Sequence, residues 1–381
     1  MKMNTGFEHY ICTGGKRLRC GYTTGTCAAL AAAGAAELLL TGTAPATVSI
    51  TTPKGIPVEV PLEQCRLEGG GASCAVRKDG GDDVDATAGL AVFAHVERQD
   101  APGIFLDGGE GVGRVTKPGL DQPVGAAAIN HVPRQMIEQA VLAVCAGQDY
   151  SGGLRVTISI PGGAALAKKT FNPELGITGG ISILGTSGIV EPMSLQALAD
   201  TVVLEIRQAA AQGHRHIILT PGNYGMDFLR ALGLDRRGVP VVKCSNFTGD
   251  ALDACAAGNF ASVLLVGHIG KLSKLAGGIM NTHSRYADCR TELFCAHAAV
   301  CGASTAVCRA LMNAASSDGC IAILEDAGLR NAVLEHMFAA AFHHLSRRAA
   351  GNYQVGALVF SNEYGLLGQA GDVKEIIESW I

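Results

Sequence analysis

The sequence ISILGTSGIVEP, residues 181–192, decides how this chain is expected to fold. Its apolar start predicts a buried strand, and the glycine loop at 185–188 lets the backbone turn tightly and approach a ligand closely. A strand that ends on such a loop is typical of open α/β sheets, which hold nucleotide-like ligands at the carboxyl ends of their strands. Glu191 would then accept hydrogen bonds from ribose hydroxyls. Taken alone, the same pattern also fits a plain structural turn.

The rest of the second half alternates strand-like and helical segments. Strands are predicted at 181–184, 216–219, 239–243, 262–266 and 354–360, and helices at 194–212, 226–232, 249–257, 286–313 and 332–349. This alternation predicts βαβ units and a largely parallel sheet. Four of these strands end in small or polar loops, with the sequences GTSG, TPGNYG, CSN and GHIG. We therefore expect these loops to form one cleft at the carboxyl edge of the sheet.

The first half has a different order of elements. A long Ala- and Leu-rich run predicts a buried helix that begins with Thr23 or Thr24 as N-cap and ends at Gly42. Further segments predict strands at 47–51, 57–60, 91–96, 104–106 and 154–160 and a helix at 132–144. We therefore predict a two-domain α/β protein. An N-terminal α+β domain at 1–177 is followed by a Rossmann-like domain at 178–381 with a mostly parallel sheet.

Composition restricts the classes of function. Hydrophobic residues make up 48% of the 381 residues but aromatic ones only 5%, which with 50 Gly favours α/β layers joined by tight loops. A net charge of -4 argues against a general nucleic-acid binder. The 13 Cys are scattered without a C-x-x-C, the N-terminal sequence does not resemble a secretion signal, and the apolar run at 28–40 is short for a membrane span. We expect a cytoplasmic protein with reduced thiols and no membrane partner.

Three polar blocks each allow two interpretations. GGEGVGRVTKPG at 108–119 could bind phosphate through backbone N–H groups, or it could form a bulged strand. The acidic residues between Asp79 and Asp85 could bind a metal, although ion pairs with Arg77 and Lys78 fit the spacing better. The block around His283 could supply acid–base chemistry or cap a helix.

Long blocks in this chain resemble, in order, the pattern of the cobalt-precorrin-5B C(1)-methyltransferases of anaerobic cobalamin biosynthesis. They are LRCGYTTGTCAA, VRKDGGDD, GGEGVGRVTKPGL, KKTFNPELGITGGISILGTSGIVEPMS, TPGNYG, CSNFTGDALD and GHIGKLSKLAGGIMNTHSRYAD, and the resemblance runs from about Arg19 to Gly365. It implies transfer of a methyl group from S-adenosylmethionine to ring carbon 1 of a cobalt-containing corrinoid precursor, which would give cobalt-precorrin-6A. The cobalt would be part of the substrate, so no protein-bound metal is implied.

With this resemblance, the loops become candidate sites. We expect S-adenosylmethionine at the carboxyl edge of the second-domain sheet, bound by Gly185, Thr186, Ser187, Gly188, Glu191, Gly222, Asn223 and Tyr224. The corrinoid, a polycarboxylate, is expected between the domains, with Arg114, Lys117, Lys271 and Arg285 as its cations. Candidate bases are His283 and His268. The oligomeric state is open, with a homo-oligomer possible.

Two other classes of protein remain open from the sequence. One is a corrinoid-binding protein without catalytic activity, which labelled methyl donor would distinguish because a carrier transfers no label. The other is a dinucleotide-dependent oxidoreductase, against which the absence of G-x-G-x-x-G in the second half counts.

Overall fold

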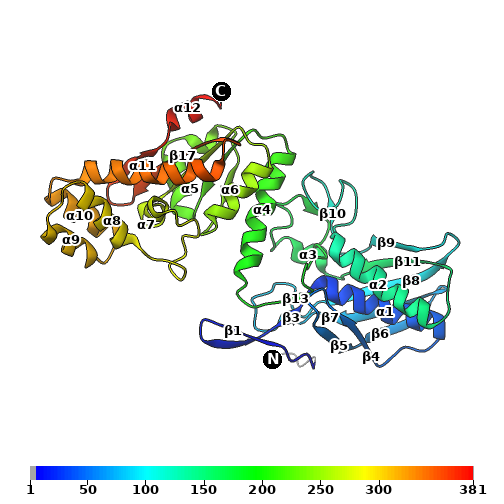
Figure 1. The fold of residues 1–381 in the computed structure, drawn as a ribbon. Coiled ribbons are helices and arrows are strands. Elements are labelled where there is room, and N and C mark those ends of the chain that lie inside the picture. The colour runs from blue at the N-terminus through cyan, green and yellow to red at the C-terminus, as the bar shows by residue number, and fades with distance from the viewer. Residues whose placement is uncertain (1–5, 381) are drawn as a thin grey trace. The chain divides into compact units, whose positions relative to one another are not determined.

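The chain forms two compact units, which we call unit 1 (Met1–Ser194) and unit 2 (Leu195–Ile381). The structure is a computed structural model that describes residues 6–380 (Figure 1). The observed division at Ser194 differs from the predicted one at 177/178. The stretch 181–192, expected to begin the second sheet, therefore belongs to unit 1.

Unit 1 is an α+β unit whose largest sheet has five strands in the order β6-β7-β8-β11-β9. Its strands are β1 (Tyr10–Thr13), β2 (Lys16–Arg19), β3 (Gly21–Tyr22), β4 (Thr47–Thr51), β5 (Pro57–Pro61), β6 (Glu63–Glu68), β7 (Gly71–Arg77), β8 (Ala91–Gln99), β9 (Ile104–Gly108), β10 (Arg114–Val115), β11 (Gly153–Ser159), β12 (Ile177–Thr178) and β13 (Ile189–Val190). Its helices are α1 (Thr24–Thr41), α2 (His131–Gly147) and α3 (Gly163–Ala167).

Helix α1 lies at the centre of unit 1. Thr23 is its N-cap and accepts a hydrogen bond from the Thr26 N–H, and Gly42 ends it in the left-handed conformation with φ +77°, as predicted. Most side chains of α1 are small, so the helix packs closely on α2, β7 and β8. By length and composition α1 would suffice to cross a membrane, but 78% of it is buried inside the unit. We interpret α1 as a core helix.

The predicted strand at 181–184 does not form, and its residues connect parts of unit 1 instead. Ile181 and Ile183 make single parallel bridges to Val112 and Ile129, and both side chains are buried in the core of unit 1. An apolar run of four residues cannot distinguish a sheet strand from a buried connection. The tertiary contacts show that residues 181–184 form a buried connection in unit 1. This segment is therefore not a strand of the unit 2 sheet.

Unit 2 is built around a five-stranded sheet in the order β15-β14-β16-β17-β18. Its strands are β14 (His216–Thr220), β15 (Val241–Lys243), β16 (Ser262–His268), β17 (Gln354–Ser361) and β18 (Gly365–Ala370). Its helices are α4 (Leu195–Ala211), α5 (Asn223–Ala231), α6 (Thr248–Ala257), α7 (Ile269–Leu272), α8 (Arg290–Val300), α9 (Thr305–Met312), α10 (Ser317–Asp326), α11 (Arg330–Ala349) and α12 (Val373–Glu378), with short 3-10 helices η1 (Leu234–Arg236) and η2 (Ser273–Gly277).

The first four strands of this sheet, in chain order, pair in parallel, and β18 pairs antiparallel with β17. Side chains alternate between the two faces, so that Leu219 joins the core under α4, α6 and α11 while Ile218 joins the core under α5 and α12. The sheet is thus covered by helices on both faces, which is the usual condition for parallel pairing (Figure 1).

The prediction for unit 2 needs correction in two places. The helix expected at 286–313 is two helices, α8 and α9, which a turn with Gly302 at φ +87° separates. Helix α10 was not predicted, because its small and polar first turn resembles a loop. Ser316 caps it by accepting a hydrogen bond from the Gly319 N–H.

The acidic cluster at 79–85 is an ion-paired loop. Lys78, only 2% exposed, donates to Asp85 at 2.6 Å, and Arg19 makes two hydrogen bonds to Asp79. Arg77 does not join this loop but pairs with Glu63. Burial alone would raise the pKa of Asp85, but the Lys78 ammonium and hydrogen bonds from Thr87 outweigh it, so the pKa lies below its ordinary value.

We expect Lys78→Met to lower the free energy of unfolding by about 3 kcal/mol at neutral pH, because it leaves the Asp85 carboxylate without its buried partner. Urea unfolding monitored by circular dichroism measures this. Arg66→Met is the control, since Arg66 and Glu68 form an exposed pair and its loss should change little. Equal effects of both variants would contradict the assignment.

The same pair predicts a pH dependence. A carboxyl group with a lowered pKa stabilises the fold above its unfolded pKa of about 3.9 and stops doing so as the pH falls through the folded value. The difference in stability between the wild type and Lys78→Met should therefore shrink below about pH 4.

Candidate active site at the carboxyl edge of the unit 2 sheet

Loops from several strands meet at one edge of the unit 2 sheet. The chain goes from β14 outward to β15 and then crosses to β16 on the other side of β14, so the carboxyl ends of β14 and β16 form a topological switch point. Ligands of open α/β sheets bind at such points. The end of β16 contacts the loop after β14, because a Cβ on Gly267 would stand 3.1 Å from Pro221.

The loop after β14 leaves room beside its backbone. Gly222 is the N-cap of α5 in an extended conformation, with φ 170°, and a Cβ there would meet nothing within 4 Å. Asn223 and Tyr224 follow in the first turn of α5, and both are exposed. Gly225 differs, since a Cβ on it would stand 1.7 Å from the Thr220 hydroxyl. Close packing therefore requires glycine at position 225. At Gly222, by contrast, the space beside the backbone is open, so a ligand can approach the backbone closely.

Lys271 connects two of the loops. Its ammonium donates to the carbonyl of Pro221 at 3.1 Å and reaches that of Ser245 at 3.5 Å. Burial lowers the pKa of Lys271. These carbonyls belong to the loops after β14 and β15, so Lys271 positions both loops. Because its ammonium already contacts two carbonyl oxygens, it is less available to pair with a carboxylate ligand.

The block that contains His283 and Arg285 is held at the same edge. Asn246, after β15, accepts hydrogen bonds from Thr282 through both its backbone and its side-chain oxygen. From the other side, the buried Lys274 ammonium donates to the carbonyls of Thr282 and Ala287 at 3.0 and 2.8 Å. Arg285 lies exposed in this loop. Among residues 6–380, no hydrogen bond or ion pair holds its guanidinium.

Both candidate histidines are arranged as hydrogen-bond donors. The Nδ1 atom of His268 accepts the Gly270 N–H at 3.0 Å, and the Nδ1 atom of His283 accepts the Arg285 N–H at 3.0 Å. A neutral imidazole that accepts at Nδ1 carries its proton on Nε2. Each ring therefore offers an Nε2–H donor, and its basic nitrogen is already used. This geometry favours a binding role over that of a general base.

The glycine loop at 185–188, in unit 1, packs against the beginning of α1. A Cβ on Gly185 would stand 2.4 Å from three atoms of the Thr23 side chain, and one on Gly188 would stand 2.7 Å from Thr52. The carbonyl of Gly188 accepts from the Thr23 N–H and from the Thr26 hydroxyl. Gly185 is thus explained by close packing on the beginning of α1, and Gly188 by close packing on Thr52 after β4.

The other residues of this loop also make internal contacts or face solvent. Ser187 hydrogen-bonds with the backbone of Ile189, while Thr186 is exposed. Glu191 is paired with Lys54, which already neutralises the carboxylate expected at the ribose.

The two unit 1 cations proposed for the substrate already have partners. Arg114 makes two hydrogen bonds to Asp107, the shorter at 2.7 Å, and a third to the carbonyl of Gly108. Lys117 is exposed and donates to the carbonyl of Glu174 at 3.3 Å. The glycine block before Arg114 is packed on backbone, since a Cβ on Gly111 would stand 1.9 Å from the Ile160 carbonyl oxygen.

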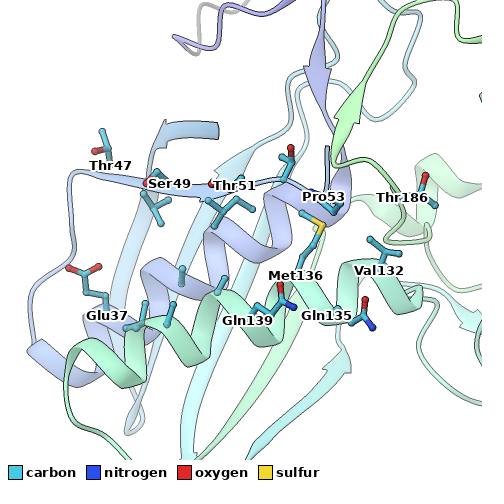
Figure 2. Close-up of a pocket in the computed structure, with 17 residues that line it drawn as sticks. Glu37, Thr47, Ser49, Thr51, Pro53, Val132, Gln135, Met136, Gln139 and Thr186 are labelled. Carbon is cyan, nitrogen blue, oxygen red and sulfur yellow. The ribbon is translucent and has the colours of Figure 1, made fainter. Parts of the chain in front are cut away.

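Unit 1 also has an open groove of 880 Å³ between β4 and α2, with α1 beneath it. Figure 2 shows Ser49 and Thr51 on one wall and Gln135 and Gln139 on the other. Nine of the 17 residues that line the groove are apolar, seven carry a hydroxyl or amide group, and Glu37 is the only charged one among them. A polycarboxylate ligand would find no cation among the residues that line the groove.

The sequence analysis missed three residues at the edge of unit 2: Ser317, Asp318 and Ser361. The Ser361 hydroxyl, at the end of β17, donates to Asp318 Oδ1 at 2.6 Å, and Asp318 Oδ2 lies 3.9 Å from His268 Nε2. The polar end of β17, at Ser361 and Asn362, was a signal that could have been used. Asp318 carried no signal, because α10 was not predicted.

Comparison with known proteins identifies the family. The CbiD family model matches residues 12–192, and the model named "CbiD, C-terminal domain" matches residues 281–371. The chain is 47% identical to a cobalt-precorrin-5B C(1)-methyltransferase of Ruminiclostridium cellulolyticum, over 93% of this chain and 92% of that protein. It is 43% identical to one of Alkaliphilus metalliredigens, over 98% of both.

A solved structure is also similar. The crystal structure titled cobalamin biosynthesis protein (cbiD) from Archaeoglobus fulgidus is 31% identical, covers 74% of this chain and 87% of its own, and has a TM-score of 0.39.

The mixed α/β fold and these relatives define a methyltransferase. More narrowly, the chain belongs to the family of cobalt-precorrin-5B C(1)-methyltransferases.

Substitutions at Gly185 and Gly222 should differ in their effect on stability. Gly185→Ala should lower the free energy of unfolding by about 1–3 kcal/mol, because its φ of +131° and the Thr23 side chain both oppose a Cβ. The control Gly222→Ser should have little effect, since serine also serves as N-cap and the added Cβ meets open space. Chemical unfolding of both variants measures this. A stable Gly185→Ala protein would contradict the packing explanation.

Proposed function

We propose that this chain transfers the methyl group of S-adenosylmethionine to carbon 1 of cobalt-precorrin-5B, which gives cobalt-precorrin-6A in anaerobic cobalamin biosynthesis. The observation that carries the placement is the gathering of polar loops at the switch point of the unit 2 sheet, in a chain of this family. In this proposal unit 2 is a Rossmann-like donor-binding unit. The cobalt belongs to the substrate.

The residues at this edge fit a nucleoside ligand. Gly222 leaves backbone open to close approach, and Tyr224, with 66% of its surface exposed, offers an aromatic face. The donor site is therefore assigned to Gly222, Asn223 and Tyr224 together with the end of β16. The loop at 185–188 supports α1 instead, so this proposal replaces its expected contacts with the donor.

S-adenosylmethionine supplies an electrophilic methyl group when bound. The chain then needs to hold and orient two ligands and to exclude water, since carbon–methyl bond formation requires no protein nucleophile. The tie of Lys271 to the carbonyls of Pro221 and Ser245 fixes the loops that would do this. His283 offers an Nε2–H donor to a carboxylate of the substrate.

The substrate contact assigned with most support is Arg285. A corrinoid precursor with many carboxylates needs an accessible cation, and the guanidinium of Arg285 is exposed while Lys271, Arg114 and Lys117 already have partners. The backbone of the loop is held firmly by Lys274 and Asn246. Arg285 is therefore a side chain available for binding on a fixed loop.

The central experiment incubates the protein anaerobically with cobalt-precorrin-5B and S-adenosylmethionine labelled in its methyl group. The wild type should yield labelled corrinoid, and Gly222→Thr should lose at least about 90% of the transfer by blocking the donor, while keeping its fold because threonine caps helices about as well as glycine. Binding of corrinoid without transfer of label would indicate a carrier and contradict the proposal.

Arg285→Ala should raise the KM for the corrinoid about tenfold or more, with little change in the affinity for S-adenosylhomocysteine, because a charge-assisted contact to one carboxylate is lost. Steady-state kinetics and calorimetry give the two values. Arg309→Ala is the control, as an exposed arginine on α9 of the same unit. An unchanged KM would remove Arg285 from the site.

A further inference from the structure

A histidine, an aspartate and two serines meet where β16 and β17 end. His268 is the last residue of β16, and Ser361 is the last of β17. The Ser361 hydroxyl donates to Asp318 Oδ1 at 2.6 Å, which leaves Oδ2 of the same carboxylate 3.9 Å from His268 Nε2. About a quarter of each of the His268 and Asp318 side chains is exposed, at 24% and 27%. The pair can therefore be reached by a ligand.

The ring of His268 is held in one orientation. Its Nδ1 accepts the Gly270 N–H at the beginning of α7. The plane of its ring stands perpendicular to the plane of the Phe360 ring, with the two centroids 5.7 Å apart. Phe360 in turn stacks on Phe228 from α5. The Nε2–H donor therefore has a fixed position at the sheet edge.

The space between His268 Nε2 and Asp318 Oδ2 favours a ligand group that can both accept and donate a hydrogen bond. A separation of 3.9 Å is too long for a hydrogen bond, so His268 Nε2–H and Asp318 Oδ2 do not satisfy each other. A hydroxyl between them accepts from Nε2–H and donates to Oδ2, with two hydrogen bonds of ordinary length. A carbonyl could use only the donor. A phosphate or carboxylate would be repelled by Asp318.

A second polar group near this pair is unsatisfied among the residues that the structure describes. Ser317, beside Asp318, is 2% exposed, and its hydroxyl has no hydrogen-bond partner within residues 6–380. Its Oγ lies 3.9 Å from the point where a Cβ on Gly270 would stand, so it faces the first turn of α7. Buried hydroxyls without a partner are uncommon in native proteins and need an explanation.

We propose that His268 and Asp318 bind a ribose hydroxyl of the methyl donor. The Nε2–H of His268 donates to this hydroxyl, and Oδ2 of Asp318 accepts from it. The inference rests on the proposed function, because it places the donor at this edge. It assigns to this pair the role expected of Glu191, whose carboxylate is paired with Lys54 in unit 1. The pair lies at the end of β16, which borders the switch point where nucleoside ligands bind.

The test is calorimetric binding of S-adenosylhomocysteine and its 2′-deoxy and 3′-deoxy analogues to the full chain. Asp318→Ala removes the acceptor. His268→Asn removes the Nε2 donor, while an asparagine oxygen can still accept the Gly270 N–H and cap α7. Asp326→Ala is the matched control, since this exposed aspartate ends the same helix, α10.

The wild type and Asp326→Ala should bind S-adenosylhomocysteine about tenfold or more tightly than one of the two deoxy analogues, as expected for a lost hydrogen bond to a charged group. In Asp318→Ala and His268→Asn the preference for that hydroxyl should shrink, because each variant removes one of the two hydrogen bonds that the hydroxyl makes. Variants that keep the full preference would overturn the proposal, even if their affinities fell.

Other outcomes separate this inference from the proposed function. If the wild type binds S-adenosylhomocysteine but shows no preference over either analogue, the ribose assignment is wrong and the methyltransferase proposal stands. If the wild type binds NADH and not S-adenosylhomocysteine, the donor placement itself is wrong, and the hydroxyl would belong to a dinucleotide.

Discussion

Parallel pairing of β14, β15, β16 and β17 is the constraint on which the candidate site depends. Parallel strands point the same way, so every loop that follows one of them leaves at the same edge. Residues far apart in sequence, such as Gly222, His268 and Ser361, therefore come to one edge. The covering helices on both faces make this pairing possible, because they bury strands that are apolar on both sides.

Fixed orientation is the common property of the polar groups at this edge. Lys271 ties together the loops after β14 and β15, and Lys274 holds the loop that carries Arg285. Two histidines use their Nδ1 atoms to bind backbone N–H groups and present Nε2–H donors. Such preorganisation suits a transfer reaction in which the protein orients two reactants and forms no covalent bond with either.

Much of the fold could be predicted because local signals agreed with tertiary packing. The cap residues Thr23 and Gly42 bounded α1, and the apolar runs of β14, β16 and β17 were long enough to be strands. The run at 181–184 was too short for its pairing partner to be inferred. Its loop glycines satisfy close packing on Thr23 and Thr52, a requirement that resembles a ligand-binding turn when only the sequence is seen.

The sequence by itself determined the family, the alternating strands and helices of the second half, and the loops that end those strands, because long motifs and hydrophobic periodicity are local properties. Only the tertiary structure decided which glycines face open space and which face side chains, which cations already have partners, and that Nδ1 of His268 and of His283 accepts a backbone N–H. It also placed Asp318 beside His268. These properties depend on contacts between residues distant in the chain, which no local pattern records.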